Sequence, residues 1–333
     1  MKVFKRIFIG LIILIVAVAV LYFLGPKLER PQFAQDLPEI PADIITLESW
    51  VNEREQSNPN IKPNNQAQVI WFDDKLNPTE YSVVYLHGFG ASHQEGYPVH
   101  KNLADSLKAN LYLARQIGHG LSSENSFKGI TAESYMMSAM EALSIGRILG
   151  EKIILIGTST GAAQAIWLAA QFPDEVEALI LYSPYISLKN SSDEKLVLGP
   201  WGTTFTKWVM GGEVNQEIRP DSVAAYWSEY YHLDAYFALF SMIHESMKAE
   251  TFEKVNCPVF MAYYYKDEEN QDEVVSVPAM KEMFEHLPSE QKKAIAFPNT
   301  GNHVIASDLR SKDWLGVRDS SWVFIKEVIL GSN

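Results

Sequence analysis

Ser159 has the residue type and the surroundings expected of a nucleophile. It lies in the pattern Gly-x-Ser-x-Gly at residues 157–161, between an apolar, β-branched run and an alanine-rich segment. The pattern is typical of a sharp strand–turn–helix junction that lifts the serine clear of a sheet, although an ordinary turn is the alternative. A serine hydroxyl is a weak nucleophile until a base removes its proton, and that base needs an orienting acid.

His303 is the histidine best placed to be the base. It directly follows the last predicted strand, residues 294–297, and the Gly- and Asn-rich approach can turn its ring back over a sheet. The alternative is a histidine in a surface loop. We expect His87 to be a structural partner of the turn that follows it and His119 to shape its loop.

The acid has two candidates, Asp267 and Asp272, both in the loop after the predicted strand 258–265. Asp267 comes directly after that strand. Asp272 precedes Val274 and Val275, which can anchor the loop in the core, and this slightly favours Asp272. A solvated run of charges is the alternative for each. With either one, the chain order serine, aspartate, histidine is the order that this kind of sheet requires.

Two backbone amides are candidates for stabilising a negatively charged oxygen. One is the amide of Thr160, which follows the serine at the start of a predicted helix. The other is the amide of Phe89, where Gly88 and Gly90 allow the backbone to approach a substrate closely. A plain strand-ending turn is the alternative for this second segment. Two such donors lower the barrier of acyl transfer by several kcal/mol.

Strands alternate with helices along most of the chain, which predicts an α/β fold with a mainly parallel, doubly wound sheet. Residues 186–251 interrupt the alternation with an aromatic-rich, irregular segment, which we interpret as an inserted helical cap. The expected organisation is a membrane segment, a proline-rich tether, a core in two parts and a cap. Their bounds are 1–25, 26–41, 42–185 with 252–333, and 186–251.

Residues 7–25 contain no charged side chain and are long enough to span a bilayer once. Lys2, Lys5 and Arg6 precede the run, which favours a cytoplasmic N-terminus and a catalytic domain outside the cytoplasm. A cleaved signal peptide, leaving a secreted or periplasmic protein, is the alternative. The run ends in large residues, which favours an uncleaved anchor and therefore the membrane as a partner.

Composition excludes several classes of function. The net charge of −13 argues against nucleic acid as a partner. The single cysteine, Cys257, excludes an internal disulfide. No Cys/His cluster has metal-ligand spacing, so we expect no metal ion. The sequence gives no oligomeric state.

Taken together, these residues resemble the α/β-hydrolase superfamily. The segments that carry the resemblance are LHGFGAS at 86–92, RQIGHG at 115–120, IGTSTG at 156–161, CPVFMAYYYKD at 257–267, QDEVV at 271–275 and GNHV at 301–304. Within the superfamily the chain is similar to carboxylesterases and monoacylglycerol-lipase-like enzymes, including members classed as serine aminopeptidases. The resemblance implies an acyl-enzyme at Ser159, His303 as base, an acid from the loop after residue 265, and no cofactor.

The function expected is hydrolysis of small-molecule carboxylic esters with an apolar acyl group. One alternative is an aminopeptidase or amidase, which would need an acidic cap residue to hold the substrate amine. The candidates for that role are Glu213, Glu217, Asp221, Glu229 and Asp234. A membrane-tethered interaction module without catalysis is a further alternative, because fold alone does not prove function.

Overall fold

The computed structural model describes residues 2–73 and 75–331, without the side chains of Lys2 and Val3. Residues 1, 74, 332 and 333 lie outside the description, so the predicted segments 1–25 and 252–333 are compared only over their described parts. The strands are β1 (Gln68–Ile70), β2 (Thr79–Leu86), β3 (Asn110–Leu113), β4 (Gly150–Thr158), β5 (Val176–Tyr182), β6 (Val214–Gln216), β7 (Tyr230–His232), β8 (Val259–Tyr263) and β9 (Lys292–Ala296).

The helices fall into three stretches of the chain. The first contains α1 (Lys2–Phe23), α2 (Ile44–Gln56), the 3-10 turn η1 (His93–Gly96), α3 (Val99–Leu107), α4 (Ala132–Leu149) and α5 (Thr160–Gln171). The second contains α6 (Ser192–Leu198), α7 (Gly202–Met210), α8 (Asp221–Ala224) and α9 (Asp234–Ser246). The third contains α10 (Ala249–Phe252), α11 (Val277–His286), α12 (Trp314–Phe324) and the π-helical turn η2 (Ile325–Ile329).

The central sheet has seven strands in the order β1-β3-β2-β4-β5-β8-β9. Strand β1 is antiparallel to β3, and every other pair is parallel. This confirms the mainly parallel α/β sheet predicted from the sequence. Because parallel strands end at one edge, the loops after β2, β4, β5, β8 and β9 meet there, and ligands of such sheets bind at that edge.

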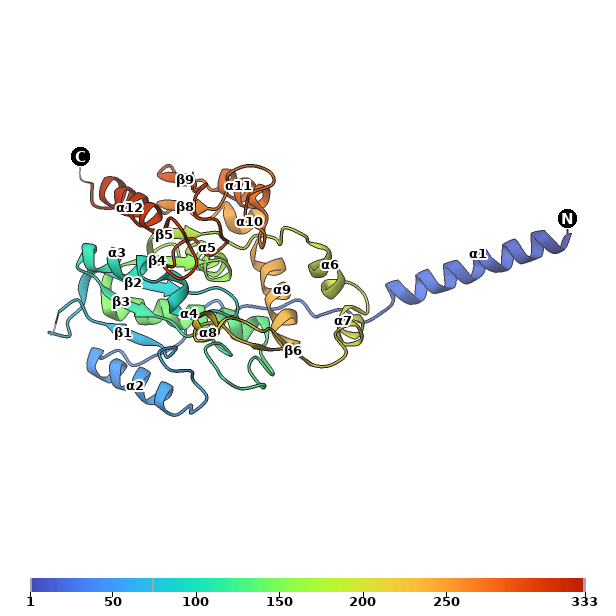
Figure 1. The fold of residues 1–333 in the computed structure, drawn as a ribbon, viewed down its shortest axis with the longest axis horizontal. Helices are drawn as coiled ribbons and strands as arrows, with labels where there is room; N and C mark the ends of the chain where they lie inside the picture. Colours follow the sequence, from blue (N-terminus) through green and yellow to red (C-terminus); the bar gives the residue numbers. More distant parts are fainter. Residues whose placement is uncertain (1, 74, 332–333) are drawn as a thin grey trace.

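Helices cover both faces of the sheet (Figure 1). Alternate residues of β4 explain this arrangement: Ile153 and Leu155 pack with α4 and α5, whereas Ile154 and Ile156 pack with α3 and α12. A strand buried on both faces reads as a continuous apolar run, and the sequence of β4 has that pattern. The strand that leads into the serine turn is therefore packed against a hydrophobic core on each face of the sheet.

Residues 186–251 contain α6, α7, α8, α9 and a two-stranded antiparallel sheet of β6 and β7. Helix α9 packs on α4 and α5 of the core and on α6, and so joins the segment to the core. The sequence predicted helices here and did not indicate β6 and β7. Strands of three residues are too short to show a two-residue periodicity.

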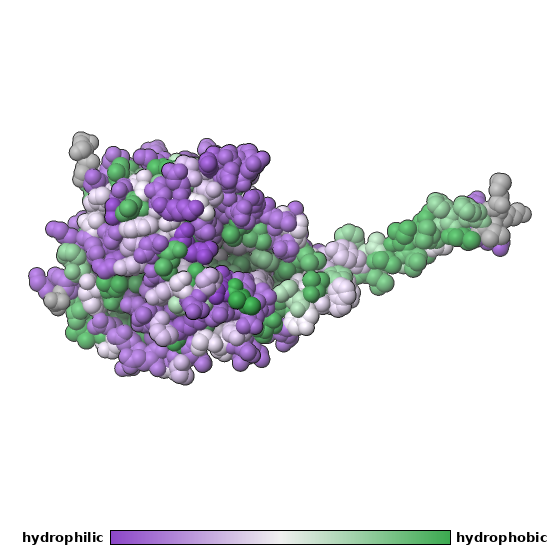
Figure 2. Space-filling view, in the orientation of Figure 1, coloured by the Kyte–Doolittle hydropathy of each residue, from purple (hydrophilic) through white to green (hydrophobic). Residues whose placement is uncertain are grey.

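Helix α1 extends away from the rest of the protein (Figure 1), and its side chains from Ile7 to Phe23 are exposed and almost all apolar (Figure 2). Its Phe4–Phe23 part is the one helix in the described chain that is long and apolar enough to cross a bilayer. A signal sequence near an N-terminus meets the same criterion, so length and composition alone do not separate the two.

Gly161 gives a test of how closely α5 approaches the sheet. A Cβ atom at this position would lie 2.0 Å from the carbonyl oxygen of Leu86 at the end of β2. We expect Gly161→Ala to lower the free energy of unfolding by about 1–3 kcal/mol, although alanine favours a helix over glycine. Chemical denaturation of the full chain in detergent measures the change.

Gly212→Ala is the matched control, because a Cβ atom there would meet no atom within 4 Å. It should leave the stability within about 0.5 kcal/mol of the unsubstituted protein. Equal stability of both variants would show that the turn and the helix do not approach as closely as described.

Candidate active site

Ser159 occupies the turn between β4 and α5. Its φ and ψ angles are 54° and −115°, an unusual conformation for a residue with a side chain. Such a conformation costs about 1–3 kcal/mol and persists only where the surroundings impose it. Here the Ser159 N–H donates to the carbonyl of Tyr182 at 2.9 Å, and the Tyr185 N–H donates to the carbonyl of Ser159 at 3.1 Å. The end of β5 thus holds the serine at the top of the turn.

The two glycines of the Gly-x-Ser-x-Gly pattern allow strand and helix to meet at this turn. A Cβ atom on Gly157 would lie 2.6 Å from the Cα of Ala162. A Cβ atom on Gly161 would collide with the backbone after β2. The sequence pattern therefore has a steric cause, and the Ser159 side chain remains 7% exposed at the edge of the sheet.

Asp272 and His303 are brought together from the loops after β8 and β9. The Nδ1 of His303 donates to Oδ2 of Asp272 at 2.6 Å. The other oxygen of Asp272, Oδ1, accepts the N–H groups of Val274 at 2.9 Å and Val275 at 3.0 Å. Both carboxylate oxygens of Asp272 accept hydrogen bonds and the residue is fully buried, so the orientation of its side chain is fixed.

The charges of this pair shift both pKa values. Burial alone would lower the pKa of His303, but the Asp272 carboxylate and its hydrogen bond outweigh burial and raise it. Burial would likewise raise the pKa of Asp272, but His303 and the two backbone N–H groups lower it. Asp272 is therefore a stable carboxylate at neutral pH, suited to stabilise a protonated imidazole.

Asp267 lies elsewhere in the same loop. Its Oδ1 accepts the N–H of Glu269 at 3.1 Å and the N–H and side-chain amide of Asn270, each at 2.8 Å. The side chain is exposed and stabilises a local turn. The structure thus brings Asp272, and not Asp267, to His303.

The pKa values of four other histidines move in the opposite direction. Burial lowers the pKa of His87 to about 4, of His100 to about 3 and of His119 well below its usual value, and it also lowers that of His93. His87 bonds through Nδ1 to the carbonyl of Gly88, the turn after β2, at 2.9 Å. These rings are neutral structural groups, in contrast to His303.

The two expected amide donors belong to segments next to Ser159. Thr160 is the first residue of α5, where N–H groups of a first helical turn lack carbonyl partners within the helix. The loop that carries Phe89 approaches from β2, since a Cβ atom on Gly88 would lie 3.1 Å from the Cβ of Ser159. Both Phe89 and Thr160 line the cavity that Ser159 faces.

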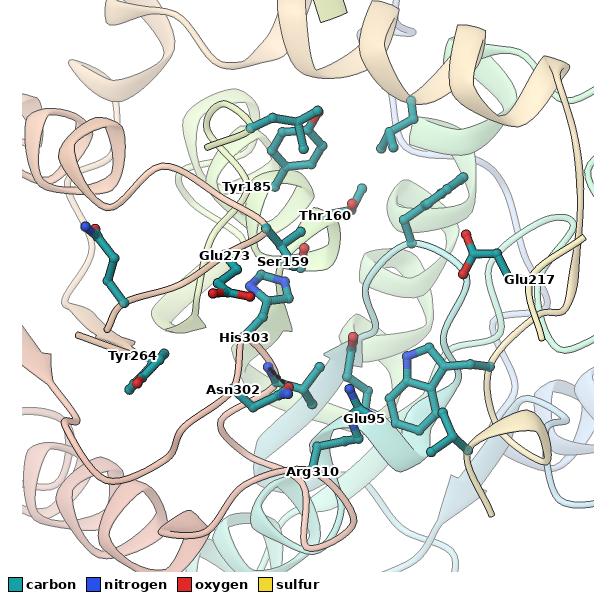
Figure 3. A pocket seen from close by; sticks show the side chains of 18 of the residues that line it. Glu95, Ser159, Thr160, Tyr185, Glu217, Tyr264, Glu273, Asn302, His303 and Arg310 are labelled. Atoms are coloured by element: carbon teal, nitrogen blue, oxygen red, sulfur yellow. Dashed lines mark hydrogen bonds between the residues drawn. The ribbon is translucent and has the colours of Figure 1, made fainter. Parts of the chain in front are cut away.

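That cavity has a volume of about 690 Å³ and is also lined by His303. Figure 3 shows the imidazole of His303 next to the Ser159 side chain. Apolar side chains from the 186–251 segment form much of the opposite wall. They are Val223, Trp227, Tyr236, Leu239 and Phe240.

Glu95 also lines the cavity, and it was not among the residues predicted from the sequence. Its Oε2 accepts the N–H of Gly88 at 2.5 Å, and the side chain is almost fully buried. Burial raises the pKa of Glu95 to about 7, although the Gly88 hydrogen bond, the charge of His303 and Tyr85 oppose the shift. Glu95 lies in the 3-10 turn η1, and an isolated glutamate in such a segment usually faces solvent.

Five acidic residues of the 186–251 segment could in principle hold a substrate amine. In the described chain Glu217 is the one of these five that lines the cavity, and it forms an ion pair with Arg219. Glu229 pairs with Lys62, Glu213 with Lys207, and Asp234 accepts the N–H of Gly129. Among residues 2–73 and 75–331 no group of three or more His, Cys, Asp and Glu side chains could hold a metal ion.

A sequence profile described as the alpha/beta hydrolase fold matches residues 81–211, which include Ser159 and the loop that carries Phe89. The chain has the α/β-hydrolase fold. It is 25% identical over 136 residues to the Mycoplasma pneumoniae protein named "Putative esterase/lipase 2". The match covers 41% of this chain and 48% of the relative, so the chain spans about half the length of that relative.

Two solved structures show the same fold. One is of the metagenome-derived lipolytic enzymes LipS and LipT, with a TM-score of 0.63, 17% identity, and coverage of 80% of this chain and 99% of the other. The second is a monoacylglycerol lipase from Paleococcus ferrophilus, with a TM-score of 0.58, 14% identity, and coverage of 78% and 98%. At these identities the likeness concerns the fold.

The buried carboxyl of Glu95 predicts a pH-dependent stability. Its pKa rises from 4.5 to about 7 on folding, so its contribution is fully present below pH 4.5 and is lost as the pH rises through 7. Glu95→Gln removes this titration. Between about pH 4.5 and 7 we expect the unfolding free energy of the unsubstituted protein to fall relative to the variant, on the order of 2–3 kcal/mol.

Denaturation curves of both proteins at several pH values measure this difference. Glu285→Gln, at an exposed position of α11, is the matched control and should show no such pH-dependent difference. If the Glu95→Gln difference were also independent of pH, the carboxyl would not be buried in the way described.

Proposed function

We propose that this α/β-hydrolase cleaves carboxylic esters with an apolar acyl group through an acyl-enzyme on Ser159. The observation that carries the proposal is the bond between His303 and the buried Asp272, placed beside the strained Ser159 turn in one cavity. In this proposal Ser159 is the nucleophile, His303 the base and Asp272 the orienting acid.

The chemistry follows from these positions. Because Nδ1 of His303 is bonded to Asp272, Nε2 is the nitrogen that accepts the Ser159 proton. The Ser159 oxygen then attacks the ester carbonyl and forms a tetrahedral oxyanion, which the amides of Phe89 and Thr160 stabilise. His303 returns the proton to the departing alcohol, leaving an acyl-serine. A water molecule, deprotonated by the same ring, releases the acid and restores the hydroxyl.

Several features support an ester substrate whose acyl group is apolar. The cavity wall contributed by α8 and α9 consists largely of aliphatic and aromatic side chains. Such walls bind apolar groups by removing their surface from water, worth roughly 25 cal/mol per Å². The relative named as an esterase/lipase and the lipolytic structural neighbours are consistent with this substrate class.

Release of amino-terminal residues has less support. An aminopeptidase site needs a carboxylate free to bind the substrate amine. Of the five acidic residues expected in this role, Glu217 lines the cavity and is paired with Arg219. A membrane-tethered module without catalysis would not need the coupled Asp272 and His303 pair.

We also propose that the protein is anchored in a membrane by α1, with the N-terminus in the cytoplasm and the α/β domain outside it. The charge-free apolar run at residues 7–25 and the basic residues Lys5 and Arg6 in the first turns of α1 support this topology. The 186–251 segment is proposed to act as the cap of the cavity.

The two aspartates of one loop give a matched test of the proposed acid. Asp272→Asn can still accept the Val274 and Val275 N–H groups, but its amide presents a donor to Nδ1 and disfavours the ring tautomer needed at Ser159. We expect kcat/KM on a p-nitrophenyl ester to fall by at least about 100-fold. Asp267→Asn should retain nearly full activity.

Ser159→Ala provides the reference for complete loss of the acyl-enzyme route. Equal losses for Asp272→Asn and Asp267→Asn, with both variants folded, would exclude Asp272 as the specific acid. Full activity of folded Ser159→Ala would exclude the whole proposal.

A further inference from the structure

Helix α7 exposes an apolar face to solvent. The face consists of Phe205, Trp208, Val209 and Met210, and Trp208 and Val209 are 79% and 65% exposed. Lys207 is the one charged residue of α7, and it pairs with Glu213 at 3.0 Å. A cluster of this kind on the surface of a folded domain marks an interaction site.

The start of α7 is bonded to the end of α1. The backbone N–H of Trp201, which precedes α7, donates to the carbonyl of Pro26 at 2.7 Å, and its indole Nε1 donates to the carbonyl of Leu21 at 3.2 Å. The indole packs against Gly25, where a Cβ atom would lie 2.0 Å from Nε1. The orientation of α7 relative to α1 is therefore set by direct contacts.

These contacts determine where α7 lies if α1 crosses a bilayer. The apolar stretch of α1 ends at Phe23, so Leu21 to Pro26 lie at the level where hydrocarbon meets the headgroups. Trp201 is hydrogen-bonded to Leu21 and Pro26 and so lies at the same depth, and tryptophan is enriched at membrane–water interfaces. Figure 2 shows apolar surface continuing from α1 onto the adjoining part of the protein. The same bilayer is thus within reach of the α7 face.

A second cavity lies next to α7. It has a volume of about 310 Å³ and is lined by Val197, Val209, Met210 and other residues of α6, α7 and α9. Asp193, Tyr236 and Phe240 line both this cavity and the one that contains Ser159. The two spaces therefore adjoin, and the smaller one lies between the α7 face and the serine.

We propose that the α7 face docks on the bilayer that α1 crosses and that this contact opens the Ser159 cavity toward lipids of that bilayer. The occupant of the face is the lipid surface, because the face continues the apolar surface of α1 and is bonded to it through Trp201. Resting on the proposed function, the substrate class is then a single-chain ester that reaches Ser159 from the membrane.

The docking is tested independently of catalysis. In a Cys257→Ser background, Trp208→Cys and Ser106→Cys each receive one environment-sensitive fluorophore. Ser106 is an exposed residue of α3. Helix α3 lies on the side of the domain away from α1 (Figure 1). The full chain is reconstituted in phosphatidylcholine vesicles, and quenching by acyl-brominated lipid is compared with quenching by aqueous iodide.

We expect the label at 208 to be quenched strongly by brominated lipid and weakly by iodide, with the reverse at 106. Equal access of iodide to both labels and no lipid quenching would overturn the proposal. A label at 208 that is shielded from iodide but not quenched by lipid would also overturn it, since a protein partner or second copy would then cover the face.

The route to Ser159 is tested by Trp208→Glu, with Leu315→Glu on α12 as the matched control for placing a charge at an exposed apolar site. Trp208→Glu should reduce the hydrolysis of a vesicle-embedded long-chain monoester several-fold and leave that of a water-soluble short ester unchanged. Leu315→Glu should change neither. Equal losses of activity on both esters in Trp208→Glu would contradict the route. If the unsubstituted protein hydrolysed neither ester, the proposed function would be contradicted, but the fluorophore result would still test the docking.

Discussion

The hydrogen bond between His303 and Asp272 is the interaction on which the site depends. It joins the loops after β8 and β9, and the sheet brings those loops close because the two strands are parallel neighbours. Without the buried carboxylate, burial would lower the pKa of the His303 ring, as it does for His87 and His100. The pairing thus makes one buried imidazole different from the others. Burying the Asp272 carboxylate costs desolvation free energy. The N–H groups of Val274 and Val275 offset this cost by donating to its second oxygen, Oδ1.

The serine turn is the other half of the arrangement, and its constraints come from the backbone. Ser159 adopts a positive φ angle because α5 must begin directly after β4, against the end of β2. Glycines at 157 and 161 remove the side chains that would prevent this approach. Glu95 binds the Gly88 amide from behind, so the loop carrying Phe89 is held from within the protein. Strain at Ser159 and burial at Glu95 are costs that the surrounding core offsets.

Much of the fold and of the candidate site could be predicted from the sequence, because local sequence patterns determine these parts. The continuous apolar strands and the Gly-x-Ser-x-Gly turn are local, and they predicted the sheet and the position of Ser159. The choice between Asp267 and Asp272 stayed open, because it depends on a turn at Asn270 that bends the loop back. Glu95 was missed because no local sequence pattern distinguishes a buried glutamate in a short turn from an exposed one. The contact of Trp201 with α1 joins residues 180 positions apart, and no local pattern predicts such a contact.

The central claim is that the Ser159 oxygen is activated by His303. The most direct measurement is the rate at which a fluorophosphonate modifies the folded, full-length protein, with the modified residue identified by peptide mass spectrometry. The account predicts one adduct, on Ser159, formed at a rate that falls as the pH drops through the titration of His303, whose pKa is raised above 6.5. Modification at another residue, no modification, or a rate that is constant between about pH 5 and 9 would contradict the account.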